Sequence, residues 1–266
     1  MASNILFIVE GNNTEWNFFK RLSESFSLNY EIYCLGTNIY TLYKKMKEIE
    51  FNGNVKDVLA EMHPEKKTIL SKRFAFTYLI FDCDAHHPKR DDTRTVDEII
   101  SDNFLKLKEM SEYFIDETDP TIGKLYINYP MMESYRDCDD FFDNNYENAV
   151  VSISDMRNYK TAVSKRKLCR IHLDKYSKQN FESLILQNIY KLNKLANGLW
   201  GKPNYKKYVS SSEVGFVLDK EKGLTRKEKI ISVLNTSLFM LVDFFGNKDG
   251  FYDSLKIPQK GIRGNE

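Results

Sequence analysis

Short apolar runs alternate with amphipathic stretches through the first half of the chain. Four of the runs have the length and composition of buried strands: 4–9, 30–35, 74–81 and 125–129. Apolar residues recur at helical spacing in three stretches between them: 15–26, 39–49 and 95–114. Strands that alternate with helices predict an α/β fold with a mainly parallel sheet flanked by helices.

The second half of the chain has a different pattern, in which strand signals fade after residue 155. Helical spacing appears around 156–175, 178–196 and 225–245, and the segment 198–212 is loop-like. We therefore expect a boundary near residue 150. It separates an α/β domain over 1–150 from a smaller, mostly helical domain over 151–266.

The composition is that of a globular protein with a substantial core. Hydrophobic residues make up 42% and aromatic residues 14% of the 266 positions, which excludes a wholly disordered chain. No uncharged apolar run reaches the roughly 18 residues of a membrane span, and no basic leader precedes the first strand. The four cysteines lack the paired spacing of zinc sites: Cys34, Cys83, Cys138 and Cys169. These features predict a cytoplasmic protein that keeps its thiols reduced and binds no membrane.

The net charge of +1 hides a strong asymmetry along the chain. Residues 1–154 contain 17 Lys and Arg against 27 Asp and Glu, whereas residues 155–210 contain 13 Lys and Arg against three acidic residues. The basic segment also contains aromatic residues: Tyr159, Tyr176, Phe181, Tyr190, Trp200, Tyr205 and Tyr208. Basic side chains neutralise phosphates and aromatic faces stack on unpaired bases, so the pattern favours nucleic-acid binding. A solvated surface is the alternative interpretation.

Three carboxylates follow predicted strands. Glu10 comes directly after the first strand, and Asp82 and Asp84 follow the third. The carboxyl ends of parallel strands form one edge of an open α/β sheet, where ligand crevices lie. Two carboxylates separated by one residue of extended chain point the same way, and hard oxygen ligands suit Mg²⁺ or Mn²⁺. The pattern predicts a metal site, and strand-end or helix-capping acids are the structural alternative.

These motifs resemble the TOPRIM domain, the metal-binding fold shared by type IA and II topoisomerases, bacterial primases and a group of nucleases. The resemblance rests on an apolar strand ending in Glu-Gly (5–11) and a later apolar strand ending in Asp-x-Asp (78–84). The segment 34–38 matches the second strand and turn of the family, so the resemblance covers about residues 4–135. It implies that the predicted domain over 1–150 is a TOPRIM-like metal-binding catalytic domain.

The nuclease branch of this family shows closer similarities. The segment 10–15 has a form often seen in overcoming-lysogenization-defect nucleases and in small bacterial abortive-infection proteins. The segment 126–135 resembles the strand, turn and glutamate-bearing helix of those small proteins, which implies that Glu133 is a further metal- or phosphate-site acid. A helix-start acid is the alternative for Glu133, and Glu15 is expected to be a first-turn helix acid. The resemblance also implies a toxic effector of anti-phage defence, controlled by a partner that is often an ATPase encoded alongside.

The chain departs from the TOPRIM pattern after the Asp-x-Asp motif. Ala85, His86 and His87 follow it, where many relatives have glycine or an acid. One of the two histidines touches metal or phosphate in one interpretation, and both belong to a surface loop in the other. The chain is too short for the gates of a topoisomerase and lacks the zinc-binding cysteines of a bacterial primase. It has no P-loop, so no ATP hydrolysis is indicated.

The basic segment supplies the candidate phosphate contacts. Arg157, Lys160 and Lys167 would lie near one face of the first predicted helix in this segment. Arg166 and Arg170 would lie near an adjacent face. The candidates for nucleic-acid binding are Arg157, Lys160, Lys165, Arg166, Lys167 and Arg170.

The sequence therefore predicts a metal-dependent endonuclease that cleaves the phosphodiesters of RNA, such as tRNA, or of DNA. Asp82 and Asp84 would hold Mg²⁺ or Mn²⁺. Glu10 would complete the metal shell or act as general acid and base, and Glu133 would recruit a second metal. Two alternatives are a non-catalytic module that binds nucleic acid or a partner, and a metal-dependent nucleotidyl- or phosphotransferase.

Overall fold

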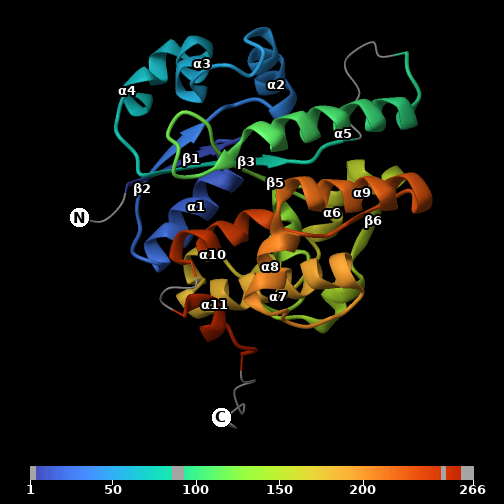
Figure 1. Cartoon of the computed structure of the whole chain (residues 1–266). Helices are drawn as coiled ribbons and strands as arrows, with labels where there is room; N and C mark the ends of the chain where they lie inside the picture. The colour runs from blue at the N-terminus through green and yellow to red at the C-terminus, as the bar shows by residue number, and fades with distance from the viewer. Residues whose placement is uncertain (1–3, 86–92, 247–249, 259–266) are drawn as a thin grey trace.

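A five-stranded sheet forms the centre of the first half of the structure, a computed structural model that describes residues 4–85, 93–246 and 250–258 (Figure 1). The strand order is β2-β1-β3-β5-β4, and neighbouring strands are parallel except for β4, which runs antiparallel to β5. The strands are β1 (Asn4–Val9), β2 (Asn29–Cys34), β3 (Phe76–Asp82), β4 (Ile115–Asp116) and β5 (Gly123–Asn128). The predicted α/β fold with a mainly parallel sheet is confirmed.

The inner strand β1, which lies between β2 and β3, is buried on both faces. Every side chain from Ile5 to Val9 is 0% exposed. The Phe7 ring lies 5.0 Å from the Phe19 ring and 6.0 Å from the Tyr78 ring, measured between centroids. A strand covered on both faces needs apolar residues at every position rather than at alternate ones. This explains the continuous apolar run that marks the strand in the sequence.

Helices cover both faces of the sheet. Those of the first half are α1 (Thr14–Ser25), α2 (Ile39–Glu48), α3 (Val55–Met62), α4 (Lys67–Leu70) and α5 (Val96–Tyr113). In Figure 1, α1 lies on one side of the sheet, together with helices from the second half of the chain, and α2, α3 and α5 lie on the other. Side chains that accept backbone N–H groups mark three of the helix starts: Asn38, Asn54 and Thr95.

The second half of the chain is largely helical, as predicted. Its α-helices are α6 (Tyr159–Val163), α7 (Lys178–Asn197), α8 (Tyr205–Ser212), α9 (Val214–Glu228), α10 (Met240–Phe245) and α11 (Phe251–Ser254). The 3-10 helices of the chain are η1 (Pro64–Lys66), η2 (Met132–Arg136), η3 (Asn144–Asn148), η4 (Ile153–Asn158), η5 (Leu168–Arg170), η6 (Leu173–Lys175) and η7 (Thr236–Phe239). Strands β6 (Val150–Ser152) and β7 (Ile230–Ser232) form an antiparallel pair. None of the helices within the described residues has both the length and the apolar character of a membrane span.

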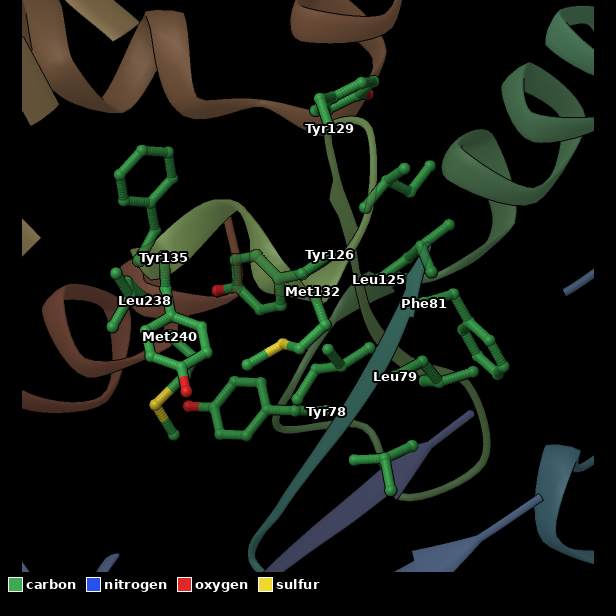
Figure 2. Packing of buried hydrophobic residues seen from close by; sticks show 14 of the residues in the cluster. Tyr78, Leu79, Phe81, Leu125, Tyr126, Tyr129, Met132, Tyr135, Leu238 and Met240 are labelled. Carbon is green, nitrogen blue, oxygen red and sulfur yellow. The ribbon is translucent and has the colours of Figure 1, made fainter. Parts of the chain in front are cut away.

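The two halves share one buried cluster. Leu238 of η7 belongs to the same cluster as Tyr78 of β3 and Tyr126 of β5 (Figure 2). Tyr129 and Leu234 exchange two backbone hydrogen bonds, each of 2.8 Å, which join the end of β5 to the segment after β7. The helical region therefore packs directly on the sheet that holds the candidate site.

The predicted helix over 156–175 is wrong, because short pieces η4, α6, η5 and η6 occupy this segment. The Lys167 N–H donates to Asp139 Oδ1 (3.0 Å), and the Leu168 N–H donates to the Cys138 carbonyl (3.4 Å). These amides bond to another part of the chain rather than to the carbonyl four residues earlier, so a continuous helix cannot form. The predicted helix faces for the basic residues are wrong for the same reason.

Two further predictions in this half need correction. The predicted loop over 198–212 contains α8, whose first turn is capped where the Lys207 N–H donates to Asn204 Oδ1 (2.9 Å). The predicted helix over 225–245 is interrupted by β7, in which Ser232 pairs with Val150. Short apolar runs do not distinguish a buried helix from a buried strand, so the pairing with β6 decides the outcome.

Candidate functional site

The carboxyl ends of β1 and β3 bring the predicted metal-site acids together. Val9 of β1 pairs with Ile80 of β3, so Glu10 and Asp82 lie at the same edge of the sheet. The Asp82 N–H donates to Glu10 Oε2 at 3.4 Å. Both acids, together with Asp84, line one pocket of about 270 Å³. We call this the acid pocket.

The first turn of α1 adds a fourth carboxylate, Glu15, to the acid pocket. Its side chain packs over Gly11, where a Cβ atom would lie 2.6 Å from Glu15 Oε2. Glu15 is only 9% exposed, so its carboxylate faces inward rather than toward solvent. From the sequence, Glu15 is expected to be a first-turn helix acid rather than a ligand. The missed signal is the bare glycine between the strand and the helix, which lets the first helical turn fold back over the strand end.

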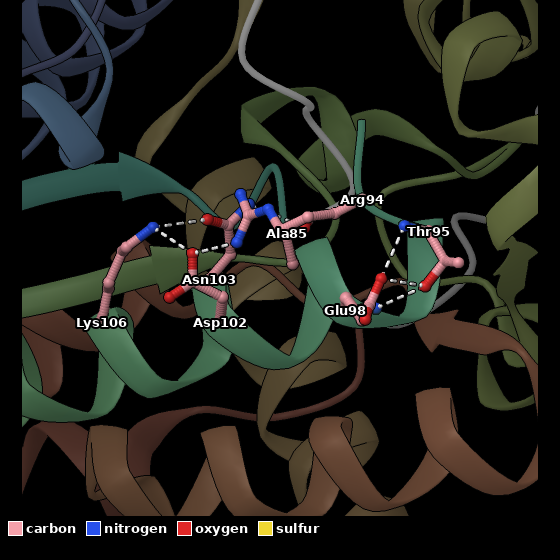
Figure 3. A network of polar contacts seen from close by, with 7 residues as sticks. All are labelled: Ala85, Arg94, Thr95, Glu98, Asp102, Asn103 and Lys106. Carbon is pink, nitrogen blue, oxygen red and sulfur yellow. Dashed lines mark hydrogen bonds and ion pairs between the residues drawn. The ribbon is translucent and has the colours of Figure 1, made fainter. Parts of the chain in front are cut away.

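The segment after β3 holds Asp84 in a constrained backbone. Asp84 has φ 36°, a left-handed conformation that non-glycine residues adopt at a cost of roughly 1–3 kcal/mol and that often occurs at functional sites. The Tyr40 hydroxyl donates to the Cys83 carbonyl (2.6 Å). Asn103 Nδ2, two turns beyond the Thr95 cap of α5, donates to the Ala85 carbonyl (3.0 Å; Figure 3). These bonds on either side fix the strained turn and aim Asp84 at the pocket.

Two residues from later in the chain complete the site. Glu133 lies on η2, is 5% exposed, and forms an ion pair with Lys160 of α6 (Oε1 to Nζ, 3.3 Å). Its other oxygen, Oε2, is buried and has no hydrogen-bond partner among the described residues. Lys160 also lines the acid pocket, so the helical region contributes a cation to it. The sequence predicts Lys160 only as a nucleic-acid contact, since the approach of its side chain to the acids depends on the tertiary fold.

The site holds more acidic than basic side chains. Among the described residues, five acidic side chains and the Lys160 ammonium group meet here; we call the five the acid cluster: Glu10, Glu15, Asp82, Asp84 and Glu133. Burial, followed by the charge of Asp84, raises the pKa of Glu10 to about 8. Burial and then the Glu10 charge raise the pKa of Asp82 well above its usual range. Burial also raises the pKa of Glu15. Such a site favours either protons or a bound cation.

The donor chemistry of the acid cluster fits Mg²⁺ or Mn²⁺. The donors are hard carboxylate oxygens, and Glu133 Oε2 is a buried oxygen without a partner among the described residues. Within the same residues, no group of three or more His, Cys, Asp and Glu side chains is arranged to hold a metal ion. Mg²⁺ is usually held by one or two carboxylates and keeps several waters, so it needs no closed protein cage. His86 and His87 lie outside the described residues.

The remaining basic candidates differ in their surroundings. Arg166 Nε donates to Asp137 Oδ1 (2.7 Å), so this guanidinium is already engaged. The other four side chains are exposed: Arg157, Lys165, Lys167 and Arg170. A shallow pocket of about 330 Å³ lies between this region and α1, and Asn13 and Thr14 belong to both it and the acid pocket. Cys169 and residues 171–174 of the basic segment thus lie next to the acid pocket, whereas the four exposed candidates line neither of these two pockets.

Comparison with protein-family models, with curated proteins and with solved structures finds no match to this chain.

Proposed function

We propose that this chain is a metal-dependent nuclease that resembles TOPRIM enzymes and cleaves nucleic-acid phosphodiesters. The observation that carries the proposal is the convergence of five carboxylates and Lys160 at the carboxyl edge of a parallel sheet. Ligand sites of open α/β sheets lie at this edge. A buried excess of carboxylates is costly for the fold, and a role in binding a cation and a phosphate explains its presence.

Each acid has a role that follows from its position. Asp82 and Asp84 would hold Mg²⁺ or Mn²⁺, and Glu10 would complete the shell or act as general acid and base. When bound, such an ion polarises the scissile phosphate and stabilises the leaving oxygen. Glu133 holds the Lys160 ammonium over the pocket through their ion pair, where it can contact a phosphate oxygen.

The basic segment would bind the nucleic-acid backbone that enters the site. Residues 155–210 carry ten more basic than acidic side chains, and all six candidate residues are exposed. Each contact between a basic side chain and a phosphate releases condensed counterions, so binding should weaken steeply with salt. Because Arg166 is bound to Asp137, it contributes mainly to the local fold.

A cleavage assay tests this proposal. Purified protein is incubated separately with total RNA and with plasmid DNA, each with Mg²⁺, Mn²⁺ or chelator. Cleavage that requires metal, is lost in Glu10→Gln and persists in the matched control Glu61→Gln is the expected result, since Glu61 is exposed on α3. Cleavage that survives both Glu10→Gln and Asp82→Asn refutes the assignment.

The proposal includes a role as a toxic effector in anti-phage defence, held in check by a partner such as an ATPase. This part rests on the resemblance of segments 10–15 and 126–135 to small abortive-infection proteins. Expression in bacteria tests it directly. Growth arrest by the unaltered protein that disappears with Glu10→Gln supports the role. In a second experiment, cells that also carry the neighbouring genes are infected with phage. Equal growth of cells with the unaltered protein and cells with Glu10→Gln contradicts the role.

A further inference from the structure

A second pocket adjoins the acid pocket and is larger. Its volume is about 520 Å³, within the range of small-molecule sites, and it shares Asn12 and Asn13 with the acid pocket. A ligand that occupies both pockets would therefore cross these two asparagines. No residue of the acid cluster lines the second pocket, so its lining must be explained separately.

One wall of this pocket is an exposed tryptophan. Trp16 lies in the first turn of α1 and is 37% exposed, although tryptophan is usually well buried. Lys20 Nζ lies 5.0 Å from the centroid of its ring. Ile32 and Ile69 add apolar surface to the lining. The pocket thus offers an aromatic plane with apolar surroundings, which is what a flat heterocyclic ring requires.

The polar groups of the lining match the edge of a base. The Asn12 and Asn13 side chains are exposed and make no hydrogen bond within the described residues. Asn17 Nδ2 donates to the Asn13 carbonyl (2.8 Å), which leaves the Asn17 oxygen as an acceptor. An amide side chain presents a donor and an acceptor side by side, and this pair recognises base edges. Lys66 Nζ, held by the Cys34 carbonyl (2.6 Å), adds positive charge at the rim.

Helix geometry links this pocket to the acids. Consecutive helical residues point about 100° apart, so Glu15 lines the acid pocket while Trp16 lines the second pocket. On the premise of the proposed nuclease function, we propose that the second pocket holds an unpaired nucleobase next to the phosphate bound at the acid cluster. Trp16 stacks on the base, and Asn12 and Asn13 contact its edge. Bases in a duplex are already paired and stacked, so the site selects single-stranded or looped segments over continuous duplex.

The chain offers a direct probe of this pocket, because Trp16 and Trp200 are its only tryptophans. Trp200 lies in the helical region, where its Nε1 donates to Asn144 Oδ1 (3.2 Å). In the double variant Glu10→Gln, Trp200→Phe, the tryptophan fluorescence comes from Trp16 alone. The Glu10→Gln change suppresses cleavage of the added strands during the measurement. Short single strands of RNA and DNA should quench this fluorescence. Blunt duplexes of the same sequence, and strands of abasic sugar-phosphate, should not.

Substitutions at Trp16 test the stacking itself. Trp16→Ala should weaken binding of the single strand by about fivefold to 100-fold, the range expected for loss of one stacked base, while duplex binding stays within about twofold. Trp16→Phe keeps an aromatic face and should retain most of the affinity. Absence of quenching together with equal binding by Trp16→Ala overturns the inference. Mononucleotides that bind as tightly as the oligonucleotide also overturn it, since the pocket would then serve a free nucleotide.

Failure of the pocket and failure of the nuclease proposal give different results. If Trp16→Ala cuts nucleic acid with the rate and strand preference of the unaltered protein, the pocket inference is wrong and the nuclease proposal stands. If the protein neither binds nor cuts any RNA or DNA, both are wrong. Both proposals are supported if cleavage is lost in Glu10→Gln and if Trp16→Ala still cleaves but no longer prefers single strands over duplex.

Discussion

Replacement of Glu221 by glutamine should flatten the pH dependence of stability in mildly acidic solution. Glu221 of α9 is 0% exposed, and its Oε2 accepts the Ser232 N–H (2.9 Å) of β7. Its Oε1 has no hydrogen-bond partner among the described residues. Burial raises the pKa of Glu221 to about 7 from 4.5, although the bonds to Ser232 and the charge of Lys191 act in the opposite direction.

The magnitude follows from the two pKa values. A carboxyl with a higher pKa in the folded state binds its proton more tightly when folded. Its stabilising contribution is complete below pH 4.5 and is lost as the pH rises to about 7. At about 1.4 kcal/mol for each pKa unit, the loss amounts to about 3 kcal/mol. Burial lowers the pKa of Lys191 from 10.5 to about 8. Below pH 8 this side chain is therefore charged and its full cost to stability is present, and that cost is relieved as the pH rises from about 8 to 10.5.

Urea denaturation followed by tryptophan fluorescence measures this effect, with chelator present throughout. Between about pH 5 and pH 7 the unfolding free energy of Glu221→Gln should rise relative to the unaltered protein by about 2 kcal/mol. Glu228→Gln is the matched control, because Glu228 lies exposed on the same helix. It should follow the unaltered protein at every pH. If the unfolding free energy of Glu221→Gln also follows that of the unaltered protein at every pH, burial does not raise the pKa of Glu221.

Three further predictions concern the candidate site. Gly11→Ala should lower kcat/KM for cleavage by about tenfold, because the alanine Cβ would lie 2.6 Å from Glu15 Oε2 and displace that carboxylate. An unchanged kcat/KM would contradict the close packing of Glu15 on Gly11. The double variant Lys165→Gln, Lys167→Gln should reduce the slope of log affinity against log salt by about 2, and an unaltered slope would remove both residues from the phosphate contacts. Chelation should abolish cleavage and lower the melting temperature, and Mg²⁺ at about 100 times its Kd should restore about 3 kcal/mol of stability. The melting temperature of Glu10→Gln should not change with Mg²⁺. If the melting temperature of the unaltered protein does not change with Mg²⁺ either, the acid cluster binds no metal.

The parts of the fold that could be predicted from the sequence are those with a strong local pattern. The strand over 4–9 is the clearest case, since burial on both faces demands a continuous apolar run. The ends of β1 and β3 follow from the same pattern, and they locate Glu10 and Asp82 at one edge. In the second half, β6 and β7 are three residues each and form only through their mutual pairing, which no local pattern encodes.

The sequence also predicts part of the candidate site. The acids at strand ends follow from the order of the elements. By contrast, the approach of Lys160 to Glu133 depends on how the helical region packs, and the segment around Lys160 is not the regular helix that its composition suggests. Glu15 shows a second limit. Its helical position is readable from the sequence, but its inward direction depends on the space left by Gly11.

The ion pair between Lys160 and Glu133 also bears on how the protein is made. Glu10 leaves the ribosome early, whereas Lys160 follows 150 positions later and Leu238, part of the shared buried cluster, later still. Contacts between such distant positions cannot form until the intervening chain has been synthesised. A nascent chain therefore carries its acids before the lysine that faces them. Under the proposed nuclease function, the candidate site would thus be complete only after most of the chain has been synthesised.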